Sequence, residues 1–365
     1  MDDAMDLGAL QDSIRDMLTT ECPRERVVRH AQHGNGIDRD LWSKAIALGW
    51  TMISIPEENG GLGLGTDALA LLYEEAGRAA APLPLLSCLL AVQSIVASAS
   101  PAQRDSWLPR IAEGAIVAMD APIGITSPGL SLSRTGGDIV LTGTVRDLLD
   151  GADAQLLLLT AADAEGRAYR IMLDVAADDL TIHRETLWDR GRSLSNITLD
   201  GLKLSADRAW LTTSEAEEAL VDHAAIALAA DSVGGQDALL DLTIEYLKTR
   251  QQFGRPIGSF QALKHRVADH RTRLEGARWL TRSAVAAVTA GLAHHATEAS
   301  AAKAQAAADY IDLGRDAIQL HGGIGFTAEY PCHVFVKRAF LNEQLFGSRT
   351  FHLNRAAAPA LCGAV

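Results

Sequence analysis

Cysteine is scarce in this 365-residue sequence, and its four copies are far apart. They stand at Cys22, Cys88, Cys332 and Cys362, so there is no Cys-x-x-Cys pair. This spacing favours neither a structural zinc site nor a disulfide framework. It predicts reduced thiols in a cytoplasmic protein and no bound metal.

Basic residues are also few. The chain has 33 lysine and arginine residues against 46 aspartate and glutamate residues, a formal net charge of −13. An acidic chain is a poor match for a phosphate backbone, so we expect no nucleic-acid partner. No uninterrupted apolar run reaches the ~18 residues that a membrane-spanning helix needs. We therefore expect no membrane span. The segment 1–18 is acidic and amphipathic, which is unlike a secretory signal.

Apolar residues, by contrast, are plentiful. They make up 48% of the chain, which is enough for a sizeable core and argues against disorder. The pattern of apolar residues changes twice along the chain. We therefore expect an α+β protein with an N-terminal helical domain (1–115), a middle β-barrel or β-sandwich domain (116–212) and a C-terminal four-helix bundle (213–365).

Helical spacing and short apolar runs indicate the individual elements. Alanine, the strongest helix former, dominates the last region, and runs bounded by Gly, Asp and Ser are typical of strands in the middle region. The expected helices cover residues 6–17, 38–48, 66–80, 227–249, 284–293 and 297–308, with another starting at 262. The expected strands cover residues 138–142, 155–160 and 169–174, and residues 188–202 are expected to be rich in hairpins.

A glycine-rich turn precedes the helix expected at 66–80. Such a turn invites comparison with the Gly-x-Gly-x-x-Gly loop of dinucleotide-binding folds. Gly61 and Gly63 have the required spacing, but Thr66 occupies the place of the third glycine. We therefore interpret this turn as a structural loop.

A second break, Arg250–Gln261 (RQQFGRPIGSFQ), separates two long expected helices. Gly254, Pro256 and Gly258 disfavour helix there, which predicts a tight connection. The segment also holds two arginines, two phenylalanines and three glutamines. A guanidinium fork, a flat apolar ring and an amide suit a diphosphate joined to a nucleobase. The alternative is a solvated loop with helix-capping charges.

Three motifs resemble those of the acyl-CoA dehydrogenases, a family of flavoproteins. They are Pro56–Gly63 (PEENGGLG), the Arg250–Gln261 connection and Gln319–Pro331 (QLHGGIGFTAEYP). The last two, in this order and with a helical stretch between them, are together specific to the family, and the resemblance covers nearly the whole chain. It implies the family's helical–β–helical fold, with FAD as the cofactor.

In this family the adenine and pyrophosphate end of each FAD is held by the helical bundle of a neighbouring subunit. The resemblance assigns this role to Arg250, Gln251, Gln252, Phe253, Phe260, Gln261, Gln319, Gly322 and Gly323. Arg250 can neutralise pyrophosphate charge, and the two glycines let backbone N–H groups approach the cofactor. The alternative role for Gly322 and Gly323 is to end a helix.

The flavin end of the site departs from the family pattern. Residues 121–129 lack the acidic residue and the order of the family's Thr-Glu-Pro motif. In the next region Asp147 occupies the place of the tryptophan that packs on the flavin, and Leu149 that of a hydroxyl residue. A carboxylate beside a flavin that must become electron-rich is electrostatically unfavourable.

The catalytic base is missing from both places that the family uses. The family reaction removes the α-proton of an acyl-CoA while a hydride leaves the β-carbon for flavin N5, which requires a nearby carboxylate. Phe346 stands where most members have a glutamate before Gly-Thr or Gly-Ser, and Ala224 stands at the alternative position. Neither side chain accepts a proton, so no catalytic residue is assigned. Glu343 and Asp231 are the candidate substitutes.

Three hypotheses follow from this resemblance. In the first, the chain is the base-lacking subunit of an α2β2 acyl-CoA dehydrogenase, which donates half of the FAD site to a catalytic subunit of the same family. Family members of this kind act on acyl-CoA or steroid side-chain CoA thioesters, with electron-transfer flavoprotein as a possible acceptor. In the second, the chain is a self-sufficient homo-oligomer with a non-standard base. In the third, it is a non-enzymatic scaffold that binds CoA esters or a protein. His321 and His352 are expected to be packing or surface residues.

Overall fold

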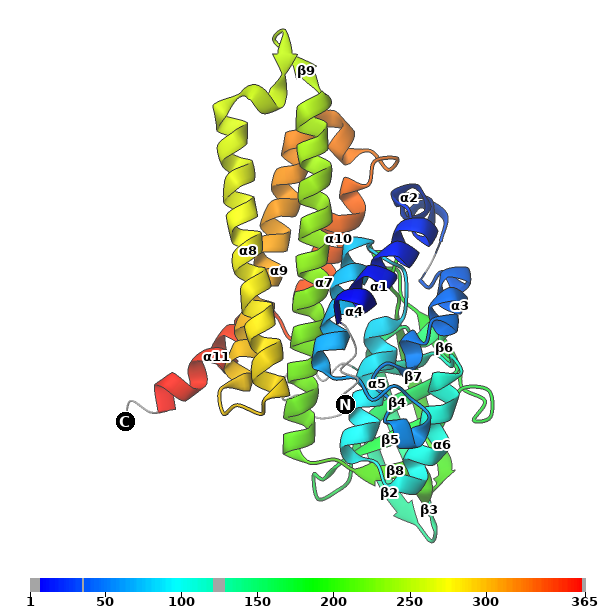
Figure 1. Cartoon of the computed structure of the whole chain (residues 1–365). Coiled ribbons are helices and arrows are strands. Elements are labelled where there is room, and N and C mark those ends of the chain that lie inside the picture. Colours follow the sequence, from blue (N-terminus) through cyan, green and yellow to red (C-terminus); the bar gives the residue numbers. More distant parts are fainter. Residues whose placement is uncertain (1–6, 35, 121–128, 363–365) are drawn as a thin grey trace. The chain divides into compact units, whose positions relative to one another are not determined.

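The computed structural model describes residues 7–34, 36–120 and 129–362. The chain divides into two compact units (Figure 1). Unit 1 holds the chain up to His33, Thr66–Ala81 and everything from Ala225 onward, whereas unit 2 holds Gly34–Gly65 and Pro82–Ala224. Helix α7 (Ser214–Thr249) begins in unit 2 and continues into unit 1.

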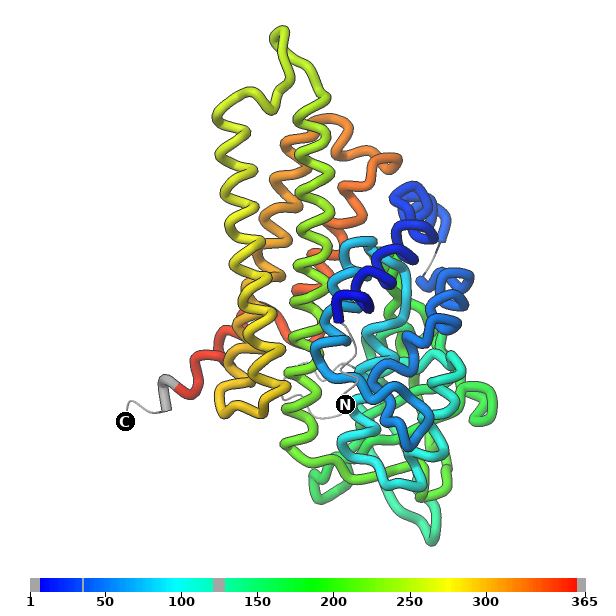
Figure 2. Tube along the Cα trace, in the orientation of Figure 1, coloured from blue at the N-terminus to red at the C-terminus, as the bar shows by residue number. Residues whose placement is uncertain are grey.

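Unit 1 is helical. Besides α7, its helices are α1 (Leu7–Glu21), α2 (Arg24–His33), α4 (Thr66–Arg78), α8 (Gln261–Thr289), α9 (His295–His321), α10 (Cys332–Gln344) and α11 (Arg349–Cys362). Helix α9 packs against α8, α10 and α11, and α7, α8 and α9 run side by side along the bundle (Figures 1 and 2). Alanines that are fully buried line α9, and their small side chains allow this close packing.

Helices α4 and α7 cross where each has a glycine. A Cβ atom at Gly77 would overlap the carbonyl oxygen of Asp231, and one at Gly234 would overlap that of Glu74. The two backbones are therefore in direct contact, and only glycine fits at either position.

Unit 2 holds the β domain and the remaining helices. Its helices are α3 (Arg39–Ala47), α5 (Leu85–Ser98) and α6 (Pro101–Ala112), with short 3-10 turns at Trp50–Met52, Glu57–Asn59, Gly151–Asp153 and Ala206–Arg208. Its strands are β1 (Val117–Met119), β2 (Leu130–Thr135), β3 (Asp138–Leu149), β4 (Leu156–Ala162), β5 (Ala168–Asp174), β6 (Ile182–Arg184), β7 (Leu194–Ser205) and β8 (Ala209–Leu211).

The eight strands form one sheet in the order β6-β7-β3-β1-β4-β5-β8, with β2 also paired to β3 and β4. All pairs are antiparallel except β1 with β4 and β2 with β4. Inward-facing residues such as Leu141, Leu157 and Ile171 build an apolar core on this sheet. Alternation of buried and exposed positions along β2 and β7 shows that one face of the sheet meets the core.

The predicted α+β class, with helices before and after a β domain, is confirmed. The expected elements match α1, α3, α4 and α7–α9 and strands β3–β5, within a few residues or as parts of longer elements. The domain boundaries at 116 and 212 stay a prediction. Among the described helices, none is both long and apolar enough to cross a membrane.

The expected hairpin-rich stretch at 188–202 is confirmed only in part, because the consecutive strands β6 and β7 form one antiparallel hairpin rather than several. Most of it lies in one twelve-residue strand, β7, which pairs with both β3 and β6. The Asp200-Gly201 pair resembles a hairpin turn in sequence, but Leu141 pairs with Leu202 and Thr142 with Asp200. Gly201, at φ 72°, is therefore the extra residue of a β-bulge inside a continuous strand.

Candidate functional site

The connection between α7 and α8 is a small hairpin at one end of unit 1 (Figure 1). Gln251–Gln252 (β9) pairs with Arg255–Pro256 (β10), and the residues between them, Phe253 and Gly254, have φ values of 54° and 75°. Positive φ at both central positions is the mark of a type I′ turn. Glycine adopts this conformation freely, whereas phenylalanine is strained in it. The predicted break between two long helices is confirmed.

Two phenylalanines and an arginine form the outer surface of this hairpin. The Phe253 side chain is 90% exposed and meets Phe260 edge to face, with ring centroids 6.0 Å apart. The Arg255 guanidinium carbon lies 4.1 Å from the Phe260 ring centroid, a cation–π contact. A phenylalanine left in water gains little of the free energy of burial, so this surface is suited to stacking against a flat ligand or a partner.

The second predicted segment is the turn that ends α9. Gly322 has φ 61° and ψ −140°, a conformation that glycine alone adopts readily, so it does end the helix. Gly322, Gly323 and Gln319 are all exposed. A Cβ atom at either glycine would meet no atom within 4 Å, so the backbone of this turn is open to an approaching group.

Aromatic contacts hold the two segments at the same end of unit 1. His321 stacks on Tyr246, one turn before Arg250, with ring centroids 4.6 Å apart, and it lies 5.0 Å from the Tyr330 ring. The His321 Nδ1 atom is 2.7 Å from the carbonyl oxygen of Ala317 and donates to it. Burial lowers the pKa of His321, so the ring is neutral and serves packing, as expected.

All nine residues that the sequence assigns to the cofactor lie in these two segments, and all except the half-buried Phe260 are exposed. We call this set the half-site. Within the described part of the chain, the Arg250 guanidinium forms no ion pair. Its backbone is fixed, because its N–H donates to Tyr246 O at 2.8 Å and its carbonyl accepts from Ile257 N at 2.8 Å. An unpaired guanidinium, an exposed phenylalanine ring in the same connection and the open backbone at Gly322 fit the nucleotide end of FAD.

The turn that carries Phe346 has the opposite character. Phe346 is fully buried at φ 52°, and its carbonyl accepts a hydrogen bond from His352 Nε2 at 2.9 Å. The Lys303 amine donates to the carbonyl oxygens of Glu343, at 3.1 Å, and Gly347. Helices α9 and α11 thus hold this turn through a buried lysine and a buried histidine.

Burial controls the charge of both groups. It lowers the pKa of Lys303 to about 7, which the nearby Glu343 carboxylate opposes. Burial, and then the neighbouring Lys303, lowers the pKa of His352 to about 3, so that this ring is neutral and donates through Nε2. Sequence analysis missed Lys303, because no motif links it to a turn some 40 residues later; its only signal was a lysine within an alanine-rich helix.

The candidate substitute bases are already engaged. Glu343 accepts from the backbone N–H of Arg349 at 2.8 Å, at the first residue of α11, and so acts as a helix cap. Asp231 is buried and accepts from Asn342 Nδ2 at 2.6 Å, with Arg338 at 3.6 Å. Ala224 is fully buried in α7, in unit 2.

The flavin-side positions lie in unit 2. Residues 121–128 fall outside the described part of the chain. Asp147 is exposed at φ 56° in a bulge of β3, and its N–H donates to Asn196 Oδ1 at 3.1 Å. Leu149 is fully buried and pairs with Met119 of β1. The leucine thus packs in the interior of unit 2.

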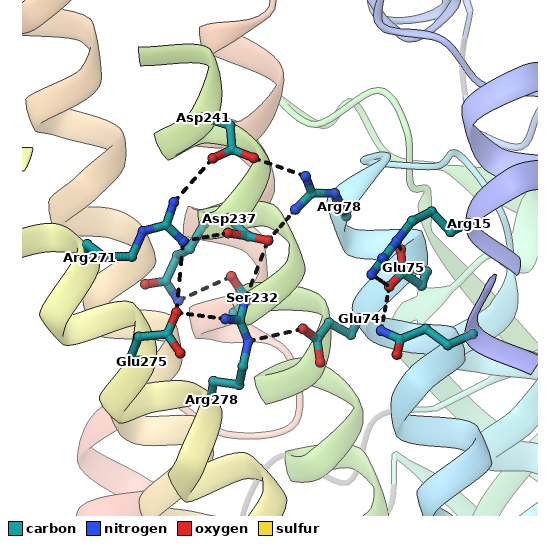
Figure 3. A network of polar contacts seen from close by, with 12 residues as sticks. Arg15, Glu74, Glu75, Arg78, Ser232, Asp237, Asp241, Arg271, Glu275 and Arg278 are labelled. Atoms are coloured by element: carbon teal, nitrogen blue, oxygen red, sulfur yellow. Dashed lines mark hydrogen bonds and ion pairs between the residues drawn. The ribbon is translucent and has the colours of Figure 1, made fainter. Parts of the chain in front are cut away.

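A charge network that sequence analysis also missed joins α4, α7 and α8 in unit 1 (Figure 3). Asp237 and Asp241, one turn apart on α7, each bridge Arg78 of α4 and Arg271 of α8. The Arg278 guanidinium of α8 lies 3.4 Å from Asp237. These ion pairs connect the three helices of the bundle. No local sequence pattern predicts them, because the paired residues come from three distant segments of the chain.

Comparisons with known proteins agree with this fold. Models of "Acyl-CoA dehydrogenase, N-terminal domain" and "Acyl-CoA dehydrogenase, C-terminal domain" match residues 6–115 and 215–361. Acyl-CoA dehydrogenase IpdE2 of Mycobacterium tuberculosis (strain ATCC 25618 / H37Rv) is 33% identical over 321 residues, which cover 86% of this chain and 84% of that protein.

Two solved structures are similar over almost their whole length. The ChsE4-ChsE5 complex from Mycobacterium tuberculosis has a TM-score of 0.89 at 25% identity and covers 99% of both chains. A Tcur3481-Tcur3483 steroid ACAD has a TM-score of 0.87 at 30% identity and covers 98% of both chains. These proteins share one FAD-dependent family and one order of helical, β and helical domains. The chain belongs to the acyl-CoA dehydrogenase family.

Proposed function

We propose that this chain is the base-lacking subunit of a heteromeric α2β2 acyl-CoA dehydrogenase. It donates the nucleotide half of an FAD site to a catalytic subunit of the same family. The observation that carries the proposal is a contrast within unit 1, between the exposed, unpaired half-site and the buried, internally bonded Phe346 turn.

The half-site supports the donor role through its chemistry. The Arg250 guanidinium can form charge-assisted hydrogen bonds with a pyrophosphate, and the Phe253 and Phe260 rings offer flat apolar surface to a nucleobase. Gln261 and Gln319 can hydrogen-bond polar groups of the nucleotide, and the open backbone at Gly322 adds N–H donors. The bound FAD would supply the hydride acceptor of the complex.

The Phe346 turn argues against a self-sufficient enzyme. A phenylalanine and an alanine occupy the two base positions, and Glu343 is committed to the start of α11. Loss of a positioned base costs about 10²- to 10⁴-fold in rate, or roughly 3–5 kcal/mol of barrier. In unit 2, Leu149 offers no hydroxyl and Asp147 no ring to a flavin. The partner must therefore provide both the base and the flavin cradle.

The relatives indicate the substrate and the assembly. One similar structure is described as a complex of two components and the other as a steroid ACAD. We accordingly propose a CoA thioester with a bulky, steroid-like acyl group as the substrate of the assembled enzyme. Electron-transfer flavoprotein is the proposed acceptor, and the cytoplasm the proposed location.

The test is to purify the chain alone and then together with a family member from a neighbouring gene that retains Glu-Gly-Thr or Glu-Gly-Ser. We expect a colourless protein alone, and a yellow complex with about one FAD per pair of different subunits. Flavin absorbance and its bleaching by acyl-CoA are the measurements. A yellow chain that is bleached by acyl-CoA on its own would support the self-sufficient enzyme instead. A chain that never acquires flavin would support the scaffold.

A further inference from the structure

A groove of about 630 Å³ lies in unit 1, between α2 and the segment that joins α9 to α10. Helix α2 lies beside α10 (Figure 1), and Gln32 Nε2 donates to the carbonyl oxygen of Ala328 at 2.9 Å. All the residues that line the groove belong to unit 1, and none belongs to the half-site. Pockets for small organic ligands have about 300–1,000 Å³, so the groove is large enough for such a ligand.

The α2 wall of the groove is basic, although the chain as a whole is acidic. Its ionisable residues are Arg24, Glu25, Arg29 and His33. Arg24 forms an exposed ion pair with Glu245 at 3.0 Å, and exposed pairs of this kind contribute little. Within the described ranges, neither Arg29 nor His33 forms a hydrogen bond or an ion pair through its side chain. They lie one helical turn apart on the same side of α2, so both can donate to one diphosphate.

The opposite wall of the groove is mostly apolar and holds an aromatic ring. It consists of Leu242 of α7 together with Glu329, Tyr330 and Pro331. His321 fixes the half-buried Tyr330 ring from within unit 1, with ring centroids 5.0 Å apart. Burial raises the pKa of Tyr330 to about 12, so its hydroxyl stays protonated. A ring held in this way offers a flat surface to a nucleobase, and the Glu329 carboxylate can accept hydrogen bonds from ribose hydroxyls.

We propose that this groove is a nucleotide site, distinct from the half-site, that binds a nucleoside diphosphate. Arg29 and His33 bind the diphosphate, the Tyr330 ring stacks on the base, and Glu329 accepts hydrogen bonds from the ribose. An inorganic anion would engage only the α2 wall, and a neutral aromatic molecule only the opposite wall. A nucleoside diphosphate carries groups for both walls. The inference does not depend on the proposed function, since none of these four residues is part of the half-site.

The first test is calorimetric titration of ADP into the purified Arg250→Ala chain, whose half-site lacks its guanidinium. We expect this chain to bind one ADP. Adding Arg29→Ala should weaken the binding at least about tenfold, because a charge-assisted hydrogen bond to phosphate is lost. Arg146→Ala, at an exposed position of unit 2, is the matched control and should leave the affinity unchanged. Absence of ADP binding, or binding that is indifferent to Arg29→Ala, would overturn the proposal.

Two further titrations test the opposite wall. Tyr330→Leu should weaken ADP binding about five- to a hundredfold, because the base loses the ring on which it stacks, whereas Tyr330→Phe keeps the ring and should bind ADP as before. Inorganic pyrophosphate should bind at least about tenfold more weakly than ADP, since it lacks the base and the ribose. Equal affinity for pyrophosphate and ADP would make the groove a plain anion site and refute the nucleotide assignment.

A last measurement separates this inference from the proposed function. FAD retention by the complex with the catalytic subunit should depend on Arg250 and not on Arg29, whereas ADP binding in the groove should depend on Arg29. If Arg29→Ala instead releases FAD from the complex, and the Arg250→Ala chain binds no ADP, Arg29 belongs to the FAD site and the separate groove site is refuted. The donor role would stand in that case.

Discussion

The hairpin at Phe253 and the turn at Phe346 each place a phenylalanine at positive φ in unit 1, yet they are opposites in every other respect. Phe253 is 90% exposed, whereas Phe346 is fully buried. The hairpin presents an unpaired guanidinium, while the carbonyl groups of the Phe346 turn are bonded to Lys303 and His352.

Under the proposed function, this difference is the one expected between a retained binding role and a lost catalytic role. A site that serves a ligand held by another chain must keep its polar and aromatic groups in solvent, at a cost in burial energy. A pocket that no longer needs a carboxylate can be filled by a side chain of its own protein, which gains that energy. Substitutions at Phe253 and Phe346 can therefore test this difference between the two turns.

The largest expected effect is that of Phe346→Glu. A carboxylate at this fully buried position loses the apolar contacts and must be desolvated, so we expect the free energy of unfolding to fall by about 4 kcal/mol. Phe253→Glu is the control and should change stability little. Urea denaturation measures both. We expect no acyl-CoA-dependent turnover from Phe346→Glu, because Asp147 and Leu149 are unchanged; turnover from this single substitution would show that the chain's own flavin site is intact.

Removal of the buried amine comes next. Lys303→Met leaves the carbonyl groups of Glu343 and Gly347 without their donor, at about 1–3 kcal/mol for each buried group left unpaired. We expect a net loss of about 3 kcal/mol in the free energy of unfolding, because part of the loss is offset by removing an amine that is costly to bury. Lys248→Met, at an exposed position of α7, is the control. Equal stability of the two variants would mean that Lys303 does not hold the turn.

A smaller effect, in binding rather than folding, is expected from Arg250→Ala. Charge-assisted hydrogen bonds contribute about 1.5–3 kcal/mol, so the complex should lose FAD roughly ten- to a hundredfold more readily. The stability of the isolated chain should not change, because Arg250 is exposed. Equilibrium dialysis of flavin from the complex measures the effect, with Lys264→Ala as the control. Unchanged flavin retention would remove Arg250 from the half-site.

The smallest effect is a pH dependence. The pKa of Lys303 is about 7 in the folded chain against its ordinary value of 10.5, so between these values the unfolded chain binds one more proton. Stability must then rise with pH across this window, by at most about 1.4 kcal/mol per pH unit. Urea denaturation at pH 7, 8 and 9 should show the stability gap between wild type and Lys303→Met widening with pH. A constant gap would contradict a neutral buried amine.

Much of the architecture could be predicted from sequence, because it depends on local chemistry. The breakers Gly254 and Pro256 predict the end of α7, and alanine content predicts α8 and α9. Within the stretch 188–202, expected to be rich in hairpins, Asp200-Gly201 forms a bulge instead of a turn, and local sequence cannot separate the two because both need a residue with positive φ. Only the partner strand β3 decides between the two.

The residues of the candidate site divide in the same way, into those that sequence motifs identify and those that only the folded structure brings together. Arg250 and Gly322 lie in motifs that can be recognised along the chain, and the structure places their segments at one end of unit 1. The Lys303 and His352 support of the Phe346 turn could not be predicted, because it joins segments that meet only after folding. The two-unit division was likewise beyond sequence analysis, since unit 1 gathers segments from three parts of the chain.

The direct backbone contact between α4 and α7 limits which substitutions this protein can accept. A single methyl group at Gly77 or Gly234 would force α4 and α7 apart, although the two helices are joined by the ion pairs of Arg78 with Asp237 and Asp241. The arginine on α4 would then be drawn away from its two aspartates, and the bundle beneath the hairpin would lose its brace. Variation in this chain is therefore constrained as firmly at two residues without side chains as at any residue that faces a ligand.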